Sequence, residues 1–305
     1  MNYEDFLKQK DYVLESSGFN IDKDKLNPML FDFQKDVVRW ALAKGRACIF
    51  ASCGLGKTLM QLSWAHQVHL HTGGKVLILA PLSVADQTKR EAEKFHYNAK
   101  VCEKQEDCID GINITNYEKL DKFVANEFVG VVLDESSILK SYTGKVRTSI
   151  IENFQNVPYK LACTATPAPN DYMELGNHSE FCGVMTRSEM LSMFFVHDGG
   201  QTSKWRLKGH AKDVFWQWMA SWSVFIDNPS NLGYDGTDYE LPNLNVHEIV
   251  VDGDKPITES LTLTERRNAR KETLELRCQK AAELVNSSDE QWLVWCDLNA
   301  EGDRL

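Results

Sequence analysis

Short apolar runs alternate with amphipathic stretches over the first half of the chain. Each run ends in a polar or glycine-containing corner, as a buried strand of a parallel sheet does. Segments between the runs place apolar residues at helical spacing, and Gly45 ends the first of them. The predicted strands are 47–50, 75–80, 111–117 with its corner, 128–133 and 159–163, and the predicted helices are 31–42, 59–71, one after residue 83, and 146–156. This pattern predicts an α/β fold, a mostly parallel sheet with helices on both faces.

The stretch 51–58 between the first predicted strand and its helix has the spacing of a phosphate-binding loop. Gly54 and Gly56 let backbone NH groups point at a polyphosphate, and the helix that follows adds its positive dipole end. Lys57 is expected to reach the β- and γ-phosphates, and the Thr58 hydroxyl to bind magnesium. Alanine stands where the usual first glycine does, so a glycine-rich turn before a helix is the alternative.

Two adjacent carboxylates, Asp134 and Glu135, follow the strand 128–133. Because the carboxyl ends of parallel strands meet at one edge of a sheet, both are expected to face the phosphate-binding loop. Asp134 would then orient magnesium, and Glu135 would polarise the attacking water. An acidic turn after a strand is the alternative, but the loop upstream favours the catalytic interpretation.

Further polar residues are predicted near the same edge. Gln34 stands shortly before the loop, and its amide can both donate and accept hydrogen bonds, as reading an adenine edge requires. Without the loop it would be a surface glutamine. Polar corners at 81–83 and 115–117 also follow strands, where ligands of parallel sheets bind. A basic cluster spans 140–147, with a solvated face as the alternative.

Composition narrows the function classes. The chain has 305 residues, 43% of them hydrophobic, which predicts two globular domains. A net charge of −10 argues against a surface that grips nucleic acid everywhere, but leaves room for a local basic track. No apolar stretch is long enough for a membrane span and the amino terminus lacks a secretory pattern, so a cytoplasmic location is expected. Eight cysteines without a Cys-x-x-Cys pair indicate reduced thiols.

The order of these motifs, completed by Thr164-Ala165-Thr166-Pro167 after the last predicted strand, resembles that of superfamily 2 helicases and translocases. The resemblance is closest to the Swi/Snf-like branch, especially its bacteriophage and prophage members with an Asp-Glu-Ser-Ser box. It covers roughly residues 30–175, and its specificity lies in the order and spacing of six motifs. The fold that it implies is a RecA-like lobe with a bound P-loop nucleotide.

The resemblance implies a role for each matching position. In the family, Gln34 would read adenine, the loop would bind ATP, Thr58 and Asp134 would hold Mg²⁺, and Lys57, Asp134 and Glu135 would be catalytic. The implied ATP-binding residues are Gln34, Gly54, Leu55, Gly56, Lys57 and Thr58; the nucleic-acid contacts are Pro81, Ser83, Gln87, Thr115, Asn116, Tyr117 and Lys140; and Thr164, Ala165 and Thr166 would couple hydrolysis to movement. Two positions depart from the family: Ser52 where an acidic residue is common, and Ser136-Ser137 where many relatives have Ala-His.

The second half of the chain changes character. Residues 176–245 are rich in aromatic side chains, and Phe215, Trp218 and Trp222 fit one helical face, so a core interpretation is favoured over base stacking. The segment resembles the helical insertion of Swi/Snf-like proteins. The predicted domains are an N-terminal extension 1–28, the RecA-like lobe 29–175, the insertion 176–245, and an incomplete second lobe 246–305 with strands at 246–251 and 291–296 and a helix at 265–286.

The function that the resemblance implies is an ATP- and Mg²⁺-dependent DNA helicase or translocase. Duplex DNA is favoured over a single strand as the substrate, and phage or host replication or recombination proteins as further partners. Little turnover is expected of this chain alone, because in relatives the second lobe supplies an arginine to the ATP site. The alternative is a truncated, non-catalytic module that binds nucleotide or DNA.

Overall fold

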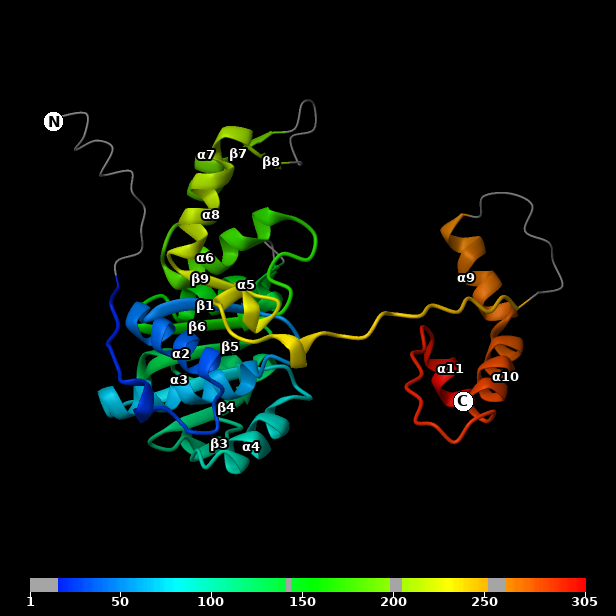
Figure 1. Cartoon of the computed structure of the whole chain (residues 1–305), viewed down its shortest axis with the longest axis horizontal. Helices are drawn as coiled ribbons and strands as arrows, with labels where there is room; N and C mark the ends of the chain where they lie inside the picture. The colour runs from blue at the N-terminus through cyan, green and yellow to red at the C-terminus, as the bar shows by residue number, and fades with distance from the viewer. Residues whose placement is uncertain (1–15, 141–143, 198–204, 252–261) are drawn as a thin grey trace. The chain divides into compact units, whose positions relative to one another are not determined.

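The computed structural model describes residues 16–140, 144–197, 205–251 and 262–305. The chain forms two compact units, Met1–Glu240 and Leu241–Leu305 (Figure 1). The larger unit contains the sheet and every motif of the predicted ATP site.

A seven-stranded, all-parallel sheet forms the centre of the larger unit. From one edge to the other its strands are β3 (Ala99–Val101), β4 (Ile112–Asn116), β2 (Lys75–Ala80), β5 (Phe128–Asp134), β6 (Tyr159–Thr164), β1 (Arg46–Ala51) and β9 (Ser223–Ile226). The predicted α/β class is confirmed, and so are the five predicted strands. The sequence did not predict β3 and β9, because three- and four-residue strands carry too few alternating apolar positions to form a pattern.

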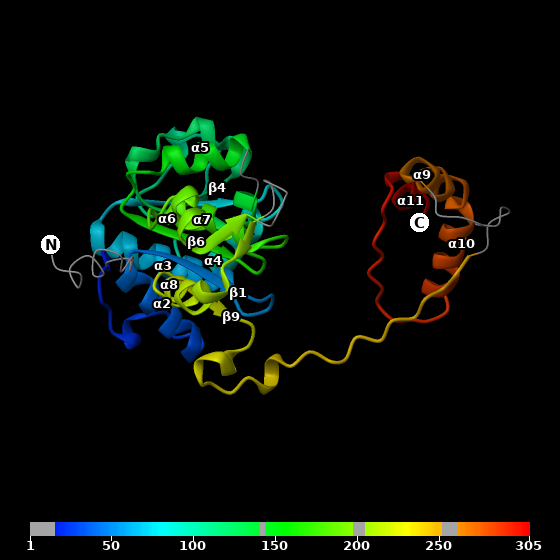
Figure 2. The ribbon, with the colours of Figure 1, turned by 90° about the horizontal axis from the view of Figure 1, so that it is seen from above.

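Helices cover both faces of this sheet. On β1, Ala47, Ile49 and Ala51 belong to one apolar core, whereas Cys48 and Phe50 belong to the core on the opposite face. Figure 2 shows α2 and α3 on one face and α5 and α6 on the other. The α-helices of this unit are α2 (Asp32–Lys44), α3 (Lys57–Thr72), α4 (Ala85–Lys94), α5 (Lys145–Asn153), α6 (Leu175–Cys182), α7 (Arg187–Phe194) and α8 (Lys212–Ala220). The four helices predicted before residue 160 are therefore confirmed.

Short 3-10 helices make most of the remaining corners. They are η1 (Lys23–Lys25), η2 (Gln105–Asp107), η3 (Tyr117–Lys122), η4 (Ala125–Glu127), η5 (Ser136–Lys140), η6 (Tyr172–Glu174), η7 (Gly209–Ala211), η8 (Pro229–Leu232) and η9 (Thr237–Tyr239). Of the predicted N-terminal extension, residues 1–15 lie outside the described part, and η1 is the helix found in 16–28.

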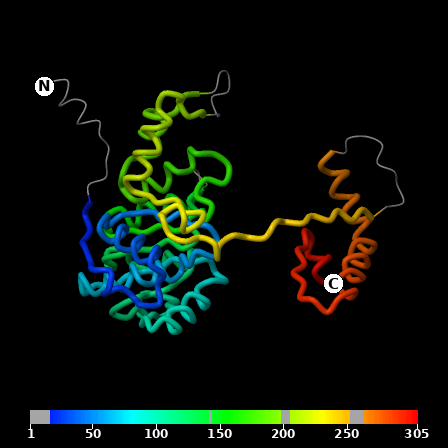
Figure 3. The backbone as a smooth tube through the Cα atoms, viewed as in Figure 1, coloured from blue at the N-terminus to red at the C-terminus, as the bar shows by residue number. Residues whose placement is uncertain are grey.

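The aromatic segment packs as a core. Phe215 and Trp222 are fully buried and Trp218 is nearly so, which confirms the core interpretation of these three residues. Before α8, the strands β7 (Phe195–His197) and β8 (Trp205–Leu207) form an antiparallel hairpin. The chain then returns to the main sheet, where β9 pairs with β1 (Figure 3). The segment predicted as a helical insertion thus also completes the edge of the sheet next to the loop.

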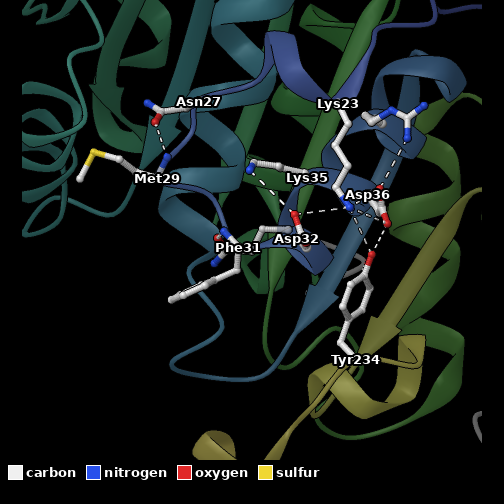
Figure 4. A network of polar contacts seen from close by, with 10 residues as sticks. Lys23, Asn27, Met29, Phe31, Asp32, Lys35, Asp36 and Tyr234 are labelled. Carbon is white, nitrogen blue, oxygen red and sulfur yellow. Dashed lines mark hydrogen bonds and ion pairs between the residues drawn. The ribbon is translucent and has the colours of Figure 1, made fainter.

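A polar network fixes α2, the helix that carries Gln34. The Lys23 ammonium lies 3.3 Å from Asp36 and 3.5 Å from Asp32, and the Tyr234 hydroxyl donates a hydrogen bond to Asp36 (Figure 4). These contacts attach η1 and the residues after η8 to the same helix face. Hydrogen bonds from Tyr234 and Lys23 lower the pKa of Asp36 despite its partial burial, so this carboxylate stays charged at neutral pH.

A buried lysine lies at the opposite, amino-terminal end of β6. The Lys160 ammonium donates to the carbonyls of Gln155 and Phe181, at 3.1 and 3.0 Å. Burial lowers its pKa from 10.5 to about 8. The folded protein therefore binds this proton more weakly than the unfolded chain, and the cost of burying the charge disappears as the pH rises from about 8 towards 10.5.

We expect the wild type to gain about 1–3 kcal/mol of unfolding free energy over that pH window relative to Lys160→Met. Urea unfolding of both proteins at neutral and at alkaline pH measures the difference, and taking the difference cancels the titration of other groups. Parallel pH profiles for the two proteins would show that Lys160 is not desolvated.

The smaller unit is helical. It contains α9 (Leu263–Glu272), α10 (Leu274–Val285) and α11 (Asn299–Arg304), and ion pairs Arg277–Glu301 and Arg304–Glu275 join the last two. The prediction of strands at 246–251 and 291–296 is wrong, because neither segment forms a strand or pairs with one among the residues that the structure describes. Their apolar side chains are largely exposed, and Trp295 is 87% exposed. An apolar run therefore does not form a strand where no neighbouring strand pairs with it. The predicted helix 265–286 is real but is interrupted at Thr273.

The assignment of 246–305 to a second RecA-like lobe, like the other domain boundaries, stays a prediction.

Among the described residues, none of the helices combines the length and apolar character needed to cross a bilayer.

Candidate active site

The predicted phosphate-binding loop connects β1 to α3. β1 ends at Ala51 and α3 begins at Lys57, so the loop lies at the carboxyl edge of the sheet. Gly54 and Gly56 have φ angles of 84° and 76°, a left-handed conformation that favours glycine. Gly56 is the N-cap of α3, and the free NH groups of the first turn follow it, with Thr58 among them. The local geometry is that of an anion-binding loop at a helix amino terminus.

Gln34 packs directly on this loop. Its Nε2 donates to the Leu55 carbonyl at 2.9 Å, and its Oε1 accepts from the Phe31 backbone NH at 2.9 Å. The side chain is 97% buried, so the alternative of a surface glutamine is wrong. One amide hydrogen remains for a ligand. Phe31, which no sequence signal marks, lies beside it and is 62% exposed.

The contact between Gln34 and the loop leads to a prediction for the two glycines. A Cβ at Gly56 would lie 2.3 Å from Gln34 Nε2, whereas a Cβ at Gly54 would meet nothing within 4 Å. Both replacements by alanine incur the left-handed backbone cost of about 1–2 kcal/mol, but only Gly56→Ala also clashes.

We therefore expect Gly56→Ala to lower the unfolding free energy by about 1 kcal/mol more than Gly54→Ala does. In a Gln34→Ala background the two glycine replacements should become equal, because the clashing amide is gone. Urea unfolding of the five variants measures this, and an unchanged gap in the Gln34→Ala background would contradict the packing described.

Lys57 points back over the loop. Its ammonium donates to the carbonyls of Ala51, at 2.9 Å, and Ser52, at 3.3 Å. These are neutral acceptors, which a phosphate oxygen can replace as a stronger, charged partner. The Ser52 hydroxyl donates to Asp227, the residue after β9, at 3.1 Å. The acidic group that relatives often carry at position 52 is thus brought close by another segment.

Asp134 ends β5, the second strand from β1 in the sheet. Its carboxylate is 95% buried and accepts hydrogen bonds from Gln61 Nε2 at 2.8 Å and from the Glu135 NH at 3.1 Å. Burial raises the pKa of Asp134, while the bond from Gln61 lowers it and the Glu135 carboxylate raises it. Gln61 itself lies one helical turn after Lys57, a position that could have been selected from the helical spacing.

The donor set beside Asp134 suits a magnesium ion. Mg²⁺ prefers oxygen ligands and keeps several waters, and the Thr58 hydroxyl and the Asp134 carboxylate supply oxygens of this kind. Gln61 Oε1 is buried and has no hydrogen-bond partner among the described residues, so it can accept from a water ligand of the ion. The residues present therefore fit magnesium.

Glu135 occupies a constrained position between β5 and η5. Its φ angle of 51° is left-handed, which is rare for a residue other than glycine. Its Oε2 accepts a hydrogen bond from the Thr164 hydroxyl at 3.1 Å, and the Thr166 NH donates to the same hydroxyl at 3.1 Å. β6, which ends at Thr164, lies between β5 and β1. The end of β6 therefore joins the acidic pair in one polar cluster, and Ala165 lies between the two threonines that form it.

The residues predicted to contact nucleic acid fall into two groups. Ser83, Gln87 and Lys140 are exposed, and Pro81 is half-buried. The side chains of Thr115, Asn116 and Tyr117 are buried, and the first and last hydrogen-bond inward, to the carbonyls of Cys102 at 2.9 Å and Asp134 at 2.6 Å. These three side chains do not form an exposed surface, and their contact with nucleic acid stays a prediction. Tyr117 hydrogen-bonds the backbone of the acidic pair.

One buried contact of the Asp-Glu-Ser-Ser box could not be predicted from local sequence signals. Ser136 Oγ lies 3.0 Å from Nε2 of His178, which comes from α6. A histidine therefore does reach the Asp-Glu-Ser-Ser box, although the box itself has none.

An apolar cavity of about 530 Å³ lies elsewhere in the same unit. It is bounded by α2, α8 and β9, and Trp40, Trp216 and Phe225 contribute to its walls. A polyphosphate needs cations, but this lining contains neither lysine nor arginine and includes the carboxylate of Asp36. The cavity therefore does not compete with the loop as the nucleotide site.

The chain is similar to several known proteins. Residues 27–169, just under half of the 305-residue chain, match the family model of the type III restriction enzyme, res subunit. The SWI2/SNF2 ATPase core of Sulfolobus solfataricus in complex with dsDNA is 21% identical, with a TM-score of 0.56 over 68% of this chain and 46% of that chain. The SWI2/SNF2 ATPase core domain of the same organism is 21% identical, with a TM-score of 0.53 over 75% and 50%.

These likenesses have limits. The chain spans about half the length of the two archaeal structures, and at 21% identity they show the fold alone. The UvsW helicase from bacteriophage T4 is 18% identical over 61% of this chain and 66% of that chain, and its TM-score of 0.43 carries no argument for a phage branch. No curated protein matches the chain. The family match covers residues 27–169, and the two archaeal structures show the fold.

Proposed function

We propose that this chain contains the ATP-binding lobe of a DNA-dependent helicase or translocase of superfamily 2, of the Swi/Snf-like type. The observation that carries the proposal is the convergence of the loop, the acidic pair and Thr164 at the carboxyl ends of three neighbouring strands, β1, β5 and β6. Phosphoryl transfer needs a phosphate cradle, a metal ligand and a group that acts on water, and the loop, Asp134 and Glu135 would supply them.

Each side chain has a defined task in this proposal. Magnesium, when bound, neutralises negative charge on the phosphates. Lys57 exchanges the carbonyls of Ala51 and Ser52 for phosphate oxygens, while Thr58 and Asp134 hold the ion. Glu135 orients the attacking water and accepts its proton. Thr164, bonded to Glu135, would transmit the state of this carboxylate to the rest of the loop 164–166.

The proposed substrate is duplex DNA. One structure of the same fold is of a complex with dsDNA. In this chain Ser83, Gln87 and Lys140 are exposed, and they would supply contacts to the sugar-phosphate backbone. Membership of a bacteriophage branch, and phage or host replication or recombination proteins as partners, belong to the same proposal and rest on the Asp-Glu-Ser-Ser box alone.

The test is steady-state phosphate release from MgATP with no DNA, with single-stranded DNA and with a duplex. Release that rises with the duplex and falls with added salt supports the proposal, because contacts to phosphates are salt-sensitive. MgATP binding without release in any of the three conditions would instead identify a non-catalytic nucleotide-binding module.

A further inference from the structure

Glu135 is held at both ends of its backbone. On its amino side, the Tyr117 hydroxyl donates to the Asp134 carbonyl at 2.6 Å. On its carboxyl side, Ser136 Oγ and His178 Nε2 are 3.0 Å apart, and both side chains are completely buried. A left-handed φ at a glutamate persists only where surrounding contacts maintain it. The partners of residues 134 and 136 are therefore candidates for the groups that maintain it.

His178 is a neutral hydrogen-bonding group. Burial lowers the pKa of its imidazole to about 4, so the ring is uncharged at neutral pH. Its ring also meets Phe50 of β1 edge-on, at 5.2 Å between centroids. Since Phe50 directly precedes the loop residues 51–58, His178 contacts both the strand that leads into the loop and the turn that carries Glu135.

Its helix neighbour provides an internal comparison. Asn177 Nδ2 donates to the Leu139 carbonyl at 2.7 Å, so α6 makes two polar contacts with η5. Both residues are fully buried. Only the contact of His178, however, is to the residue adjoining Glu135. If α6 had only a structural role, loss of either contact would have the same effect on catalysis.

We propose that His178 is a positioning residue for the reaction: through Ser136 it fixes the backbone of Glu135, and hence the direction of its carboxylate towards the attacking water. This inference rests on the proposed function, in which Glu135 acts on water. It also gives the segment 176–245 a direct connection to the catalytic carboxylate, because α6 opens that segment.

The experiment compares substitutions on the full 305-residue chain. His178→Leu removes the hydrogen bond at similar volume, and we expect it to lower kcat for ATP hydrolysis by about tenfold or more while KM changes less than about twofold. His178→Gln places an amide nitrogen near the former Nε2 and should recover most of the rate. Ser136→Ala, a smaller change, should match His178→Leu, and the double variant should be no slower than either.

Asn177→Leu is the matched control, because it removes the other polar contact from the same helix. It should lower the unfolding free energy as His178→Leu does but leave kcat within about twofold. A readout without turnover is the affinity for MgADP with aluminium fluoride, a transition-state analogue. His178→Leu and Glu135→Gln should weaken this affinity by about tenfold relative to that for MgADP alone.

The outcomes distinguish a failure of the role inferred for His178 from a failure of the proposed function. If the wild type hydrolyses ATP or binds the analogue, and His178→Leu does both as well as the wild type, His178 is structural only and the inference is overturned. An equal loss in Asn177→Leu also overturns it. If the wild type neither binds MgADP nor hydrolyses ATP, the proposed function fails and the inference fails with it.

Discussion

Replacing Lys57 by alanine is expected to weaken MgATP binding by about 100-fold or more. The ammonium is the only cation of the loop 51–58, and it already lies over the loop carbonyls at 2.9 and 3.3 Å. A hydrogen bond between charged groups contributes about 1.5–3 kcal/mol, and each 1.4 kcal/mol is tenfold in affinity. Two such bonds to phosphate oxygens therefore account for a loss of this size.

Calorimetric titration of MgATP into Lys57→Ala, the wild type and Lys89→Ala measures this loss. Lys89 serves as the control because it is a half-exposed lysine of α4, ion-paired to Glu93, and is not part of the loop. Its replacement should leave the affinity unchanged. Equal affinity for Lys57→Ala and the wild type would mean that the phosphates bind elsewhere.

The second large effect concerns Glu135→Gln, which should bring the ATP hydrolysis of the chain down to background and leave MgATP binding within a fewfold of the wild type. The glutamine keeps a carbonyl oxygen that can accept the bond from Thr164, so the local structure is retained. It loses the charge and the ability to accept a proton from water. General-base catalysis of this kind contributes about 10²–10⁴ in rate.

Phosphate release in the presence of duplex DNA, together with nucleotide titration, separates the two effects of this substitution. Glu152→Gln, an exposed carboxylate of α5, is the matched control and should behave as the wild type does. A Glu135→Gln variant that keeps its hydrolysis rate would remove this residue from the mechanism, whatever its affinity for ATP.

Local sequence signals were sufficient to predict five of the seven strands of the sheet, and the loop. The strands β1, β2, β5 and β6 are apolar runs buried on both faces. Such strands can be predicted from their own residues, without information about the rest of the chain. The carboxyl-edge position of Lys57, Asp134 and Glu135 then follows from parallel topology. For the same reason the neighbouring positions of the loop and Thr164 could be expected before the structure was known.

Contacts between distant segments could not be predicted in this way. His178 reaches Ser136 across 42 residues, and Asp227 reaches Ser52 across 175. Tyr117 and Thr115 turn inward because β4 is covered on both faces, which a polar corner in the sequence does not reveal. The strands predicted at 246–251 and 291–296 failed for a related reason, since strand formation depends on a partner that the local pattern does not specify.

The most direct test of the account is a crystal structure of the chain with magnesium, ADP and beryllium fluoride. We expect phosphate density along residues 54–58, the Lys57 ammonium moved from the Ala51 carbonyl onto that density, and a metal ion bound by Thr58 and Asp134. Nucleotide density in the apolar cavity between Trp40 and Phe225, or a bound nucleotide with Lys57 still on the Ala51 carbonyl, would contradict it.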